Sequence, residues 1–259
     1  MNLPDSVFTG AETILDIGGW FKPETRATHV IDLMPWETRG AAFNPEPLPG
    51  EHFNKATWFQ ADFLKADFKL PFADKSFDLV ICGHTVEDLS NSQKLLDEMQ
   101  RVGKRGAIEC PSRLTEQTLG IRDRQSALPG HPHHHWIVES IDGVLWLYSK
   151  EDSDLTAPAR VIPLDYTAGV TAASPDAHLM LHLWSERIDY RIIRGAECAR
   201  RAGAFVASLN IPSGLRLKDS AARLGRRLRS RLRGAAAEDT SWWPRIVERS
   251  RPYSSIELP

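Results

Sequence analysis

The sequence of 259 residues has few cysteines, no long apolar run and little net charge. Its three cysteines, Cys82, Cys110 and Cys198, lie far apart, which excludes a disulfide framework and a C-x-x-C zinc motif and suits a reducing cytoplasm. No apolar run approaches the ~20 residues that span a bilayer. The first residues lack a basic segment followed by an apolar one, so we expect no signal peptide and a cytoplasmic location.

The net charge of −2 excludes a general nucleic-acid coat protein, but it conceals an uneven distribution. Residues 211–259 hold 11 basic and 5 acidic side chains, a net charge of +6. The preceding 210 residues hold 21 basic and 29 acidic side chains, a net charge of −8. A mildly acidic body therefore carries a basic tail.

Short apolar runs predict a parallel sheet in the first part of the chain. Such near-continuous runs are typical of strands buried on both faces, and they cover residues 12–18, 28–33, 57–63, 76–83 and 105–111. Before the last run, Leu95, Leu96, Met99 and Val102 recur at helical spacing and Gly103 follows as a stop. We predict an α/β fold, a doubly wound, mostly parallel sheet whose ligand site lies at the carboxyl ends of the strands.

The strand rhythm ends near Pro111. A polar segment with prolines and histidines follows, and we expect a long loop or lid there. Further strands are predicted at 144–150, 178–184 and 189–195, and in the second of these His178, Met180, His182 and Trp184 would share one face. The sequence thus predicts a cofactor-binding core (1–113), an α+β capping region with the lid on the substrate side (114–210) and the basic tail (211–259).

Glycines and acids stand where the predicted strands end. Gly18 and Gly19 follow the first strand and let a ligand approach the backbone, because no Cβ intervenes. Asp32 ends the second strand, where an acid can accept hydrogen bonds from a ribose diol. Asp62 follows the third strand and can accept from an adenine amino group, while Phe63 offers an apolar contact to a purine ring.

The motifs ILDIGG, VIDL, QADF, LPFADKSFDLVICGHTVEDL and LLDEMQRVGKRGAIECPS, in this order, resemble the class I S-adenosylmethionine-dependent methyltransferases. The resemblance covers residues ~10–113. It implies that Asp16, Gly18 and Gly19 surround the methionine part of the cofactor, Asp32 its ribose and Asp62 its adenine. It also implies that Cys82, Gly83 and His84, after the fourth strand, face the sulfonium and the substrate.

The sequence departs from the family pattern in three places. The adjacent Gly18 and Gly19 replace the usual G-x-G, and Asp88 replaces the histidine of the family's EHL triplet. Only 15 residues, Pro23 among them, separate Asp16 from Asp32, so the usual first helix must be short or missing. A nicotinamide-binding Rossmann protein is the competing interpretation, but it requires three spaced glycines that are lacking.

Methyl transfer to a hydroxyl requires alignment, worth up to ~7–11 kcal/mol, and a base with a pKa near 7. His84 is the candidate base; a purely structural histidine in the loop after the strand is the alternative. Residues 131–136 (HPHHHW) hold four of the nine histidines. Metal ligation, a substrate-facing lid and a solvated loop all fit this tract.

We favour the substrate-facing lid, with a catalytic role for His133. In an extended strand His133 and His135 would share a face and His134 would point away, so a divalent metal is not favoured. His135 and Trp136 are the candidate substrate contacts in the lid. Arg113 could hold an anionic group of the substrate, or be an ordinary surface arginine.

The basic tail contains an amphipathic pattern over 217–233, with leucines on one stripe, arginines opposite and two tryptophans at 242–243. Peripheral contact with the inner membrane surface through 217–243 fits it, as does packing on the body or on a second copy. Nucleic-acid binding fits less well, because no aromatic-basic interleaving occurs elsewhere.

The sequence leaves the oligomeric state open. We expect methyl transfer to a hydroxyl of a sugar, glycan or small metabolite, with a non-catalytic cofactor- or partner-binding module as the alternative.

Overall fold

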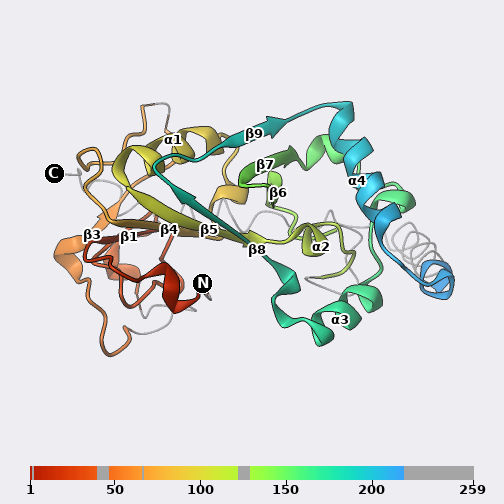
Figure 1. Ribbon diagram of the computed structural model, residues 1–259, viewed down its shortest axis with the longest axis horizontal. Coiled ribbons are helices and arrows are strands. Elements are labelled where there is room, and N and C mark those ends of the chain that lie inside the picture. Colours follow the sequence, from red (N-terminus) through yellow and green to blue (C-terminus); the bar gives the residue numbers. More distant parts are fainter. Residues whose placement is uncertain (2, 40–46, 66, 122–128, 219–259) are drawn as a thin grey trace.

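The computed structural model describes residues 1, 3–39, 47–65, 67–121 and 129–218, and it contains a central six-stranded sheet. The strands lie in the order β3-β2-β1-β4-β5-β8 (Figure 1). Five are mutually parallel and β8 is antiparallel to β5. Their bounds are β1 (Ile14–Ile17), β2 (His29–Asp32), β3 (Trp58–Gln60), β4 (Leu79–Gly83), β5 (Arg105–Pro111) and β8 (Leu179–Ser185). The predicted α/β class and all five predicted strands of the first part are confirmed.

Strands β1, β2, β4 and β5 of this sheet are buried on both faces, as their apolar sequences require. Helix α1 (Ser92–Val102) covers one face with Leu95, Leu96 and Met99, which are fully buried, and it ends at Gly103 as predicted. On the other face, Leu3 and other residues of the amino-terminal segment pack against β1, β2 and β4. Short 3-10 helices complete this part of the chain: η1 (Asp5–Val7), η2 (Trp36–Thr38), η3 (Lys55–Thr57) and η4 (Val86–Asp88).

The connection from β1 to β2 has no helix, which confirms the expectation of a short or missing first helix. Residues 18–28 instead form bends and turns. The carboxylate of Asp16 accepts a hydrogen bond from the Glu24 amide at 2.8 Å and thereby ties this irregular segment to β1. The carboxyl end of β1 is therefore bordered by loop backbone.

A second sheet has the order β6-β7-β9 and is built from β6 (Trp136–Ile141), β7 (Val144–Ser149) and β9 (Tyr190–Ile193). Strands β6 and β7 form a hairpin around Asp142 and Gly143, both with positive φ, as a two-residue hairpin turn requires. The expectation of a loop was wrong for residues 136–141, where the polar Glu139 and Ser140 hid a strand. Further helical segments are α2 (Arg113–Glu116), α3 (Leu164–Ala173), α4 (Ala196–Ser208), η5 (Glu151–Ser153), η6 (Pro158–Arg160) and η7 (Pro175–His178).

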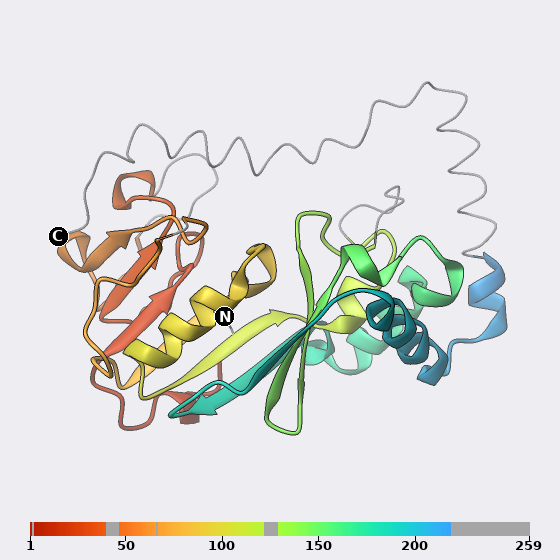
Figure 2. The ribbon, with the colours of Figure 1, turned by 90° about the horizontal axis from the view of Figure 1, so that it is seen from above.

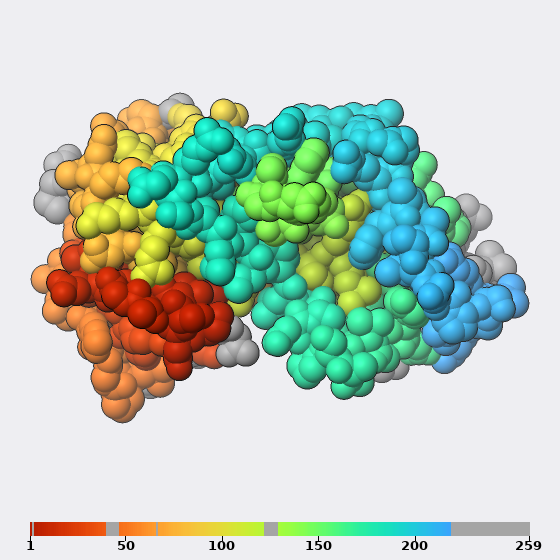
Figure 3. Space-filling model, in the orientation of Figure 1, coloured from red at the N-terminus to blue at the C-terminus, as the bar shows by residue number. Residues whose placement is uncertain are grey.

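The molecule is elongated (Figures 2 and 3), with the first sheet toward one end and the helices α3 and α4 toward the other (Figure 1). Strand β8 comes from the later part of the chain but completes the first sheet. The division of the chain into a core (1–113), a capping region (114–210) and a basic tail (211–259) therefore stays a prediction from the sequence. Residues 213–218 are helical, and the rest of the predicted basic helix lies outside the described residues. Within the described ranges, no helix combines the length and apolar character needed to cross a membrane.

Strand β8 shows the alternation predicted from its sequence, except that His178 ends η7, lies outside the strand and is exposed. Met180, His182 and Trp184 are buried, while the side chains of Leu181 and Leu183 point away from the core and are exposed. Trp184 packs over Gly106 of β5, where an added Cβ would lie 2.6 Å from the indole ring. Contact between these two strands therefore depends on a large residue facing a residue without a side chain.

We predict that Trp184→Ala destabilises the protein by about 3–5 kcal/mol, because it leaves a cavity over Gly106. Leu183→Ala is the matched control, because its side chain is 55% exposed on the opposite face of the same strand. Its expected effect is within about 0.5 kcal/mol. Urea unfolding followed by circular dichroism measures both, and equal effects would contradict the packing of β8 on the core.

Candidate active site at the carboxyl ends of the strands

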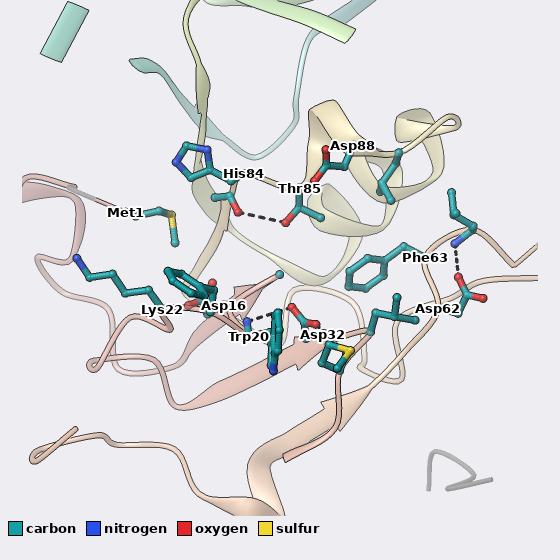
Figure 4. A pocket seen from close by; sticks show the side chains of 18 residues that line it. Met1, Asp16, Trp20, Lys22, Asp32, Asp62, Phe63, His84, Thr85 and Asp88 are labelled. Atoms are coloured by element: carbon teal, nitrogen blue, oxygen red, sulfur yellow. Dashed lines mark hydrogen bonds between the residues drawn. The ribbon is translucent and has the colours of Figure 1, made fainter. Parts of the chain in front are cut away.

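A cavity of ≈450 Å³ lies at the carboxyl ends of β1, β2 and β4. Strand order reverses between β1 and β4, and ligands of open α/β sheets bind at such a switch point. In Figure 4, Met1, Lys22 and His84 lie toward one end of the cavity, and Asp62 and Phe63 toward the other. The lining residues are Met1, Asp16, Gly18, Gly19, Trp20, Phe21, Lys22, Asp32, Leu33, Met34, Asp62, Phe63, Leu64, Gly83, His84, Thr85, Asp88 and Leu89.

Gly18 and Gly19 line the cavity, and neither position has room for a side chain. Gly18 has a φ of +78°, and an added Cβ would lie 1.8 Å from the hydroxyl oxygen of Thr85. At Gly19 an added Cβ would lie 2.8 Å from Oδ2 of Asp16. The two adjacent glycines thus expose backbone without side chains at the place where the family pattern has G-x-G.

Asp16 is fully buried at the end of β1, and burial raises the pKa of its carboxyl to about 7. Its Oδ2 accepts the Glu24 amide hydrogen, whereas Oδ1 has no hydrogen-bond partner among the described residues. A buried acceptor without a partner is costly, by about 1–3 kcal/mol. Because Asp16 lines the cavity, a cationic or hydrogen-bonding group of a ligand would remove this cost.

Asp32 is held rigidly at the end of β2. Its two oxygens accept hydrogen bonds from the amides of Trp20, at 3.1 Å, and Met34, at 2.8 Å. Burial raises the pKa of this carboxyl to about 6. Each carboxylate oxygen has a second lone pair, so Asp32 can still accept from a diol in the cavity.

Asp62 and Phe63 lie at the far end of the same cavity. The carboxylate of Asp62 accepts the Leu64 amide hydrogen at 2.9 Å. Phe63 is buried and packs edge-on against Phe68. The structure therefore brings together six of the seven residues predicted to bind the cofactor.

Cys82, the seventh of these residues, does not line the cavity. Its side chain is fully buried in the core, where burial raises the thiol pKa well above its ordinary value. The cause is the alternation of β4: the residue that borders the cavity at the strand end is Gly83, against which Met1 packs.

His84 lines the cavity but is placed between two buried carboxylates. Its Nε2 lies 3.5 Å from Glu109 and its Nδ1 lies 3.6 Å from Glu87. These carboxylates raise the pKa of His84 to about 9. The imidazole is therefore protonated at neutral pH and has no lone pair for a proton, which argues against the predicted role as general base.

The histidine tract does not form a solvated loop. Its segment docks on η4, where the His135 amide donates to the Glu87 carbonyl at 2.7 Å. His134 is buried and its Nδ1 lies 2.8 Å from Glu116, while His133 and His134 both face Asp88. The sequence carried a signal only for the partner of His84, since Glu109 interrupts the apolar run of the fifth predicted strand and such an acid needs compensation when buried.

The predicted substrate contacts lie in two different places. Arg113 is buried, pairs with Glu139 and lies over the rings of Tyr148 and Phe205, so its charge is paired inside the protein, although its Nη2 has no hydrogen-bond partner among the described residues. His135 and Trp136 line a second cavity of ≈680 Å³. Trp136 is itself buried and donates its indole N–H to the Leu89 carbonyl, because β6 places it in the core.

Residues 37–109 match the family described as a methyltransferase domain. No curated protein matches the chain. Among solved structures, an S-adenosylmethionine-dependent methyltransferase from Aquifex aeolicus is 20% identical with a TM-score of 0.29, over 39% of this chain and 57% of that one. One from Mesorhizobium loti is 16% identical with a TM-score of 0.34, over 79% and 76%. The YcgJ protein from Bacillus subtilis is 22% identical with a TM-score of 0.26, over 39% and 44%.

The match to a methyltransferase domain lies within the part of the chain over which the sequence resembles the class I S-adenosylmethionine-dependent methyltransferases. S-adenosylmethionine is the cofactor that this resemblance implies. The residues that line the cavity fit this cofactor. They include a buried carboxylate oxygen without a hydrogen-bond partner among the described residues, two glycines and two further acids at successive strand ends.

We predict that Gly18→Ala weakens binding of S-adenosylmethionine at least about tenfold, equivalent to 1.4 kcal/mol, because the new methyl group displaces Thr85 into the cavity. Gly10→Ala is the matched control: Gly10 has a similar φ of +72° but nothing within 4 Å of an added Cβ. Isothermal titration calorimetry measures both affinities. Unchanged binding by Gly18→Ala would show that the cofactor does not approach this glycine.

We predict a pH-dependent stabilisation by His84. Because its folded pKa of about 9 exceeds the unfolded value of 6.5, the contribution is complete below pH 6.5 and is lost as the pH rises through about 9. The difference in melting temperature between wild type and His84→Asn should therefore shrink from pH 6 to pH 10. Asparagine tolerates the positive φ of this position. A difference that does not change with pH would contradict a charged His84.

Proposed function

We propose that this enzyme transfers the methyl group of S-adenosylmethionine to a hydroxyl of a sugar, glycan or small metabolite. The observation that carries the proposal is the difference in side chains between the two ends of the cavity. One end holds Asp62 and the apolar Phe63, and the other holds the charged side chains of Lys22 and His84. A cavity of this volume is in the range of small-molecule sites, about 300–1,000 Å³.

In this proposal the acids at the strand ends hold the cofactor. Asp32 accepts from the ribose hydroxyls, Asp62 from the adenine amino group, and Asp16 from the methionine ammonium group. When bound, the cofactor supplies an activated methyl group on a sulfonium. The chain's own task is then to align an acceptor oxygen, to exclude water and to accommodate the hydroxyl proton.

His84 has a different role from the one its position first suggested. A protonated imidazole can donate a hydrogen bond, so His84 would orient an oxygen of the acceptor at the charged end of the cavity. Its position is set by Glu87 and Glu109, which are both buried. The pKa near 9 keeps this donor charged over the physiological range.

The second cavity supports a hydroxyl-rich acceptor. His135, Lys150, Glu151, Thr156 and Arg194 are among its lining residues, and such a mixture of donors and acceptors suits a sugar better than an apolar ring. This cavity is bordered by His134, and the first cavity by Asp88, which face each other. A large acceptor would therefore occupy the second cavity and present its hydroxyl near Asp88.

The basic pattern over 217–243 supports an acceptor at a membrane, such as a lipid-linked sugar. An amphipathic arginine-rich helix with neighbouring tryptophans favours anionic membrane surfaces. We propose peripheral contact with the inner membrane surface on this basis. Flotation of the full chain with anionic but not zwitterionic vesicles is the expected result; the same flotation with both, or with neither, would contradict it.

The first test is cofactor binding. Asp32→Ala should weaken the affinity for S-adenosylmethionine by roughly 10- to 150-fold, the loss of a charged hydrogen bond worth about 1.5–3 kcal/mol. Asp74→Ala is the control, because Asp74 does not line the cavity and its side chain is 77% exposed. Calorimetry gives the affinities, and a thermal melt without cofactor shows whether each variant is folded. Equal affinities would remove Asp32 from the site.

The second test is transfer of radioactive methyl from S-adenosylmethionine to fractionated cell extracts. Label in sugar-containing or small-molecule fractions, dependent on Asp32, supports the proposal. Label confined to protein or nucleic acid would overturn the proposed acceptor. Binding of the cofactor with no label in any fraction would instead favour a non-catalytic cofactor- or partner-binding module.

A further inference from the structure

We propose that Asp88, His133 and His134 bind one divalent transition-metal ion, with Zn²⁺ as the best match, at the border between the two cavities. Asp88 comes from η4 and the histidines from the tract that docks on it. One ligand atom of each residue lies within 4.8 Å of the others. One carboxylate and two imidazoles are a ligand set typical of catalytic zinc.

The distances match a shared ion better than they match hydrogen bonds. Oδ1 of Asp88 lies 3.5 Å from Nε2 of His133 and 3.4 Å from Nε2 of His134. Direct N–H···O hydrogen bonds span about 2.7–3.2 Å. Two ligand atoms that each lie ~2.0–2.1 Å from a tetrahedral zinc ion are separated by roughly 3.3–3.4 Å.

The local backbone explains how neighbouring histidines reach one point. In an extended strand their side chains would diverge, but residues 131–134 form a turn in which the His134 amide donates to the His131 carbonyl at 3.1 Å. The rings of His133 and His134 are consequently 4.4 Å apart and nearly perpendicular. Both present Nε2 to the same carboxylate oxygen.

The surroundings of His134 are those of a metal-bound histidine. Its Nδ1 lies 2.8 Å from Oε1 of the buried Glu116, which leaves Nε2 facing Asp88. A carboxylate behind a ligating histidine fixes the ring and raises its basicity. Lys150 in turn lies 2.5 Å from Oε2 of Glu116 and donates to the His131 carbonyl, so one side chain holds both the carboxylate and the turn.

Asp88 has an unsatisfied hydrogen-bond acceptor, and a bound metal ion would satisfy it. Its Oδ1 is buried and has no hydrogen-bond partner within the described part of the chain. Protonation of His134 between Asp88 and Glu116 is the alternative that would also compensate this charge. The two alternatives differ in whether the cluster takes up a metal ion, and this difference is measurable.

The proposed ion would have a function in the proposed reaction, on which this step rests. Three protein ligands leave one position open, and Asp88 also lines the cofactor cavity. An acceptor hydroxyl bound there would lose its proton to water more readily, because the ion lowers its pKa. The resulting oxygen forms a bond to the methyl carbon as the carbon–sulfur bond breaks, which leaves a neutral thioether. No protein base is then needed, in agreement with a protonated His84.

The test uses the full chain without an added histidine tag, treated with chelator and then titrated with Zn²⁺. We expect one tightly bound ion per chain, measured by competition with a chromophoric chelator and by elemental analysis. His133→Ala and Asp88→Asn should each weaken binding at least about 100-fold, since a first ligand counts for more than the 10–100-fold of an outer partner. Glu116→Gln should weaken Zn²⁺ binding by roughly 10–100-fold, because Glu116 supports the ligand His134 without binding the ion itself.

His135→Ala is the matched control, a neighbouring histidine that is not in the cluster and should leave affinity unchanged. Because a variant could fail to fold, binding of S-adenosylmethionine is measured for each. Zn²⁺ should also raise the melting temperature of the wild type and not of His133→Ala. No stoichiometric Zn²⁺ in the wild type, or equal affinity in all variants, would overturn the site.

Failure of the metal site and failure of the proposed function are distinguishable. Zn²⁺ bound at this cluster without methyl transfer to any sugar fraction supports the site and contradicts the proposed acceptor. Methyl transfer that persists unchanged in a chain shown to be free of metal overturns the role of the ion. Transfer that is lost with the metal and restored by Zn²⁺ supports both.

Discussion

The structure depends on the burial of acidic side chains at the carboxyl edge of the first sheet. Glu87, Glu109 and Glu116 are nearly inaccessible to solvent, and Asp16 is fully enclosed. A buried carboxylate is tolerated only when a cation, hydrogen-bond donor or metal compensates it. The arrangement of the site follows from how each of these acids is compensated. Glu87 and Glu109 hold a protonated His84, Glu116 is shared by His134 and Lys150, and Asp16 keeps one oxygen for the ligand.

This requirement also joins the two parts of the fold. Asp88 on η4 belongs to the first 113 residues, whereas His133 and His134, which face it, belong to the segment that leads into the second sheet. Removing that segment would leave Asp88 without these imidazoles. Strand β8 adds a second connection, because its buried face completes the first sheet from the later part of the chain. The cofactor cavity and the capping region are therefore coupled by charge as well as by packing.

The sequence was sufficient for the first sheet because each of its strands is a local apolar run, and a run buried on both faces is visible without its neighbours. The acids at the carboxyl ends of β1, β2 and β3 could be predicted for the same reason, since these strand ends lie at one edge of the sheet. Strand β6 escaped prediction because its polar second half faces solvent in a hairpin and interrupts the pattern. Arg113 and Trp136 could not be placed, since their burial depends on Glu139 and Leu89, which lie far from them in sequence.

The histidine tract shows why spacing alone cannot decide on a metal site. An extended backbone sends consecutive side chains to opposite faces, and on that premise three adjacent histidines do not converge. The premise fails because Lys150 and the carbonyl of Glu87 hold the tract in a turn, and these partners are 19 and 44 residues away from His131. The turn brings together two of the histidines, and the third ligand is Asp88, the residue that departs from the family's triplet. Asp88 thus links the histidine tract to the cofactor cavity.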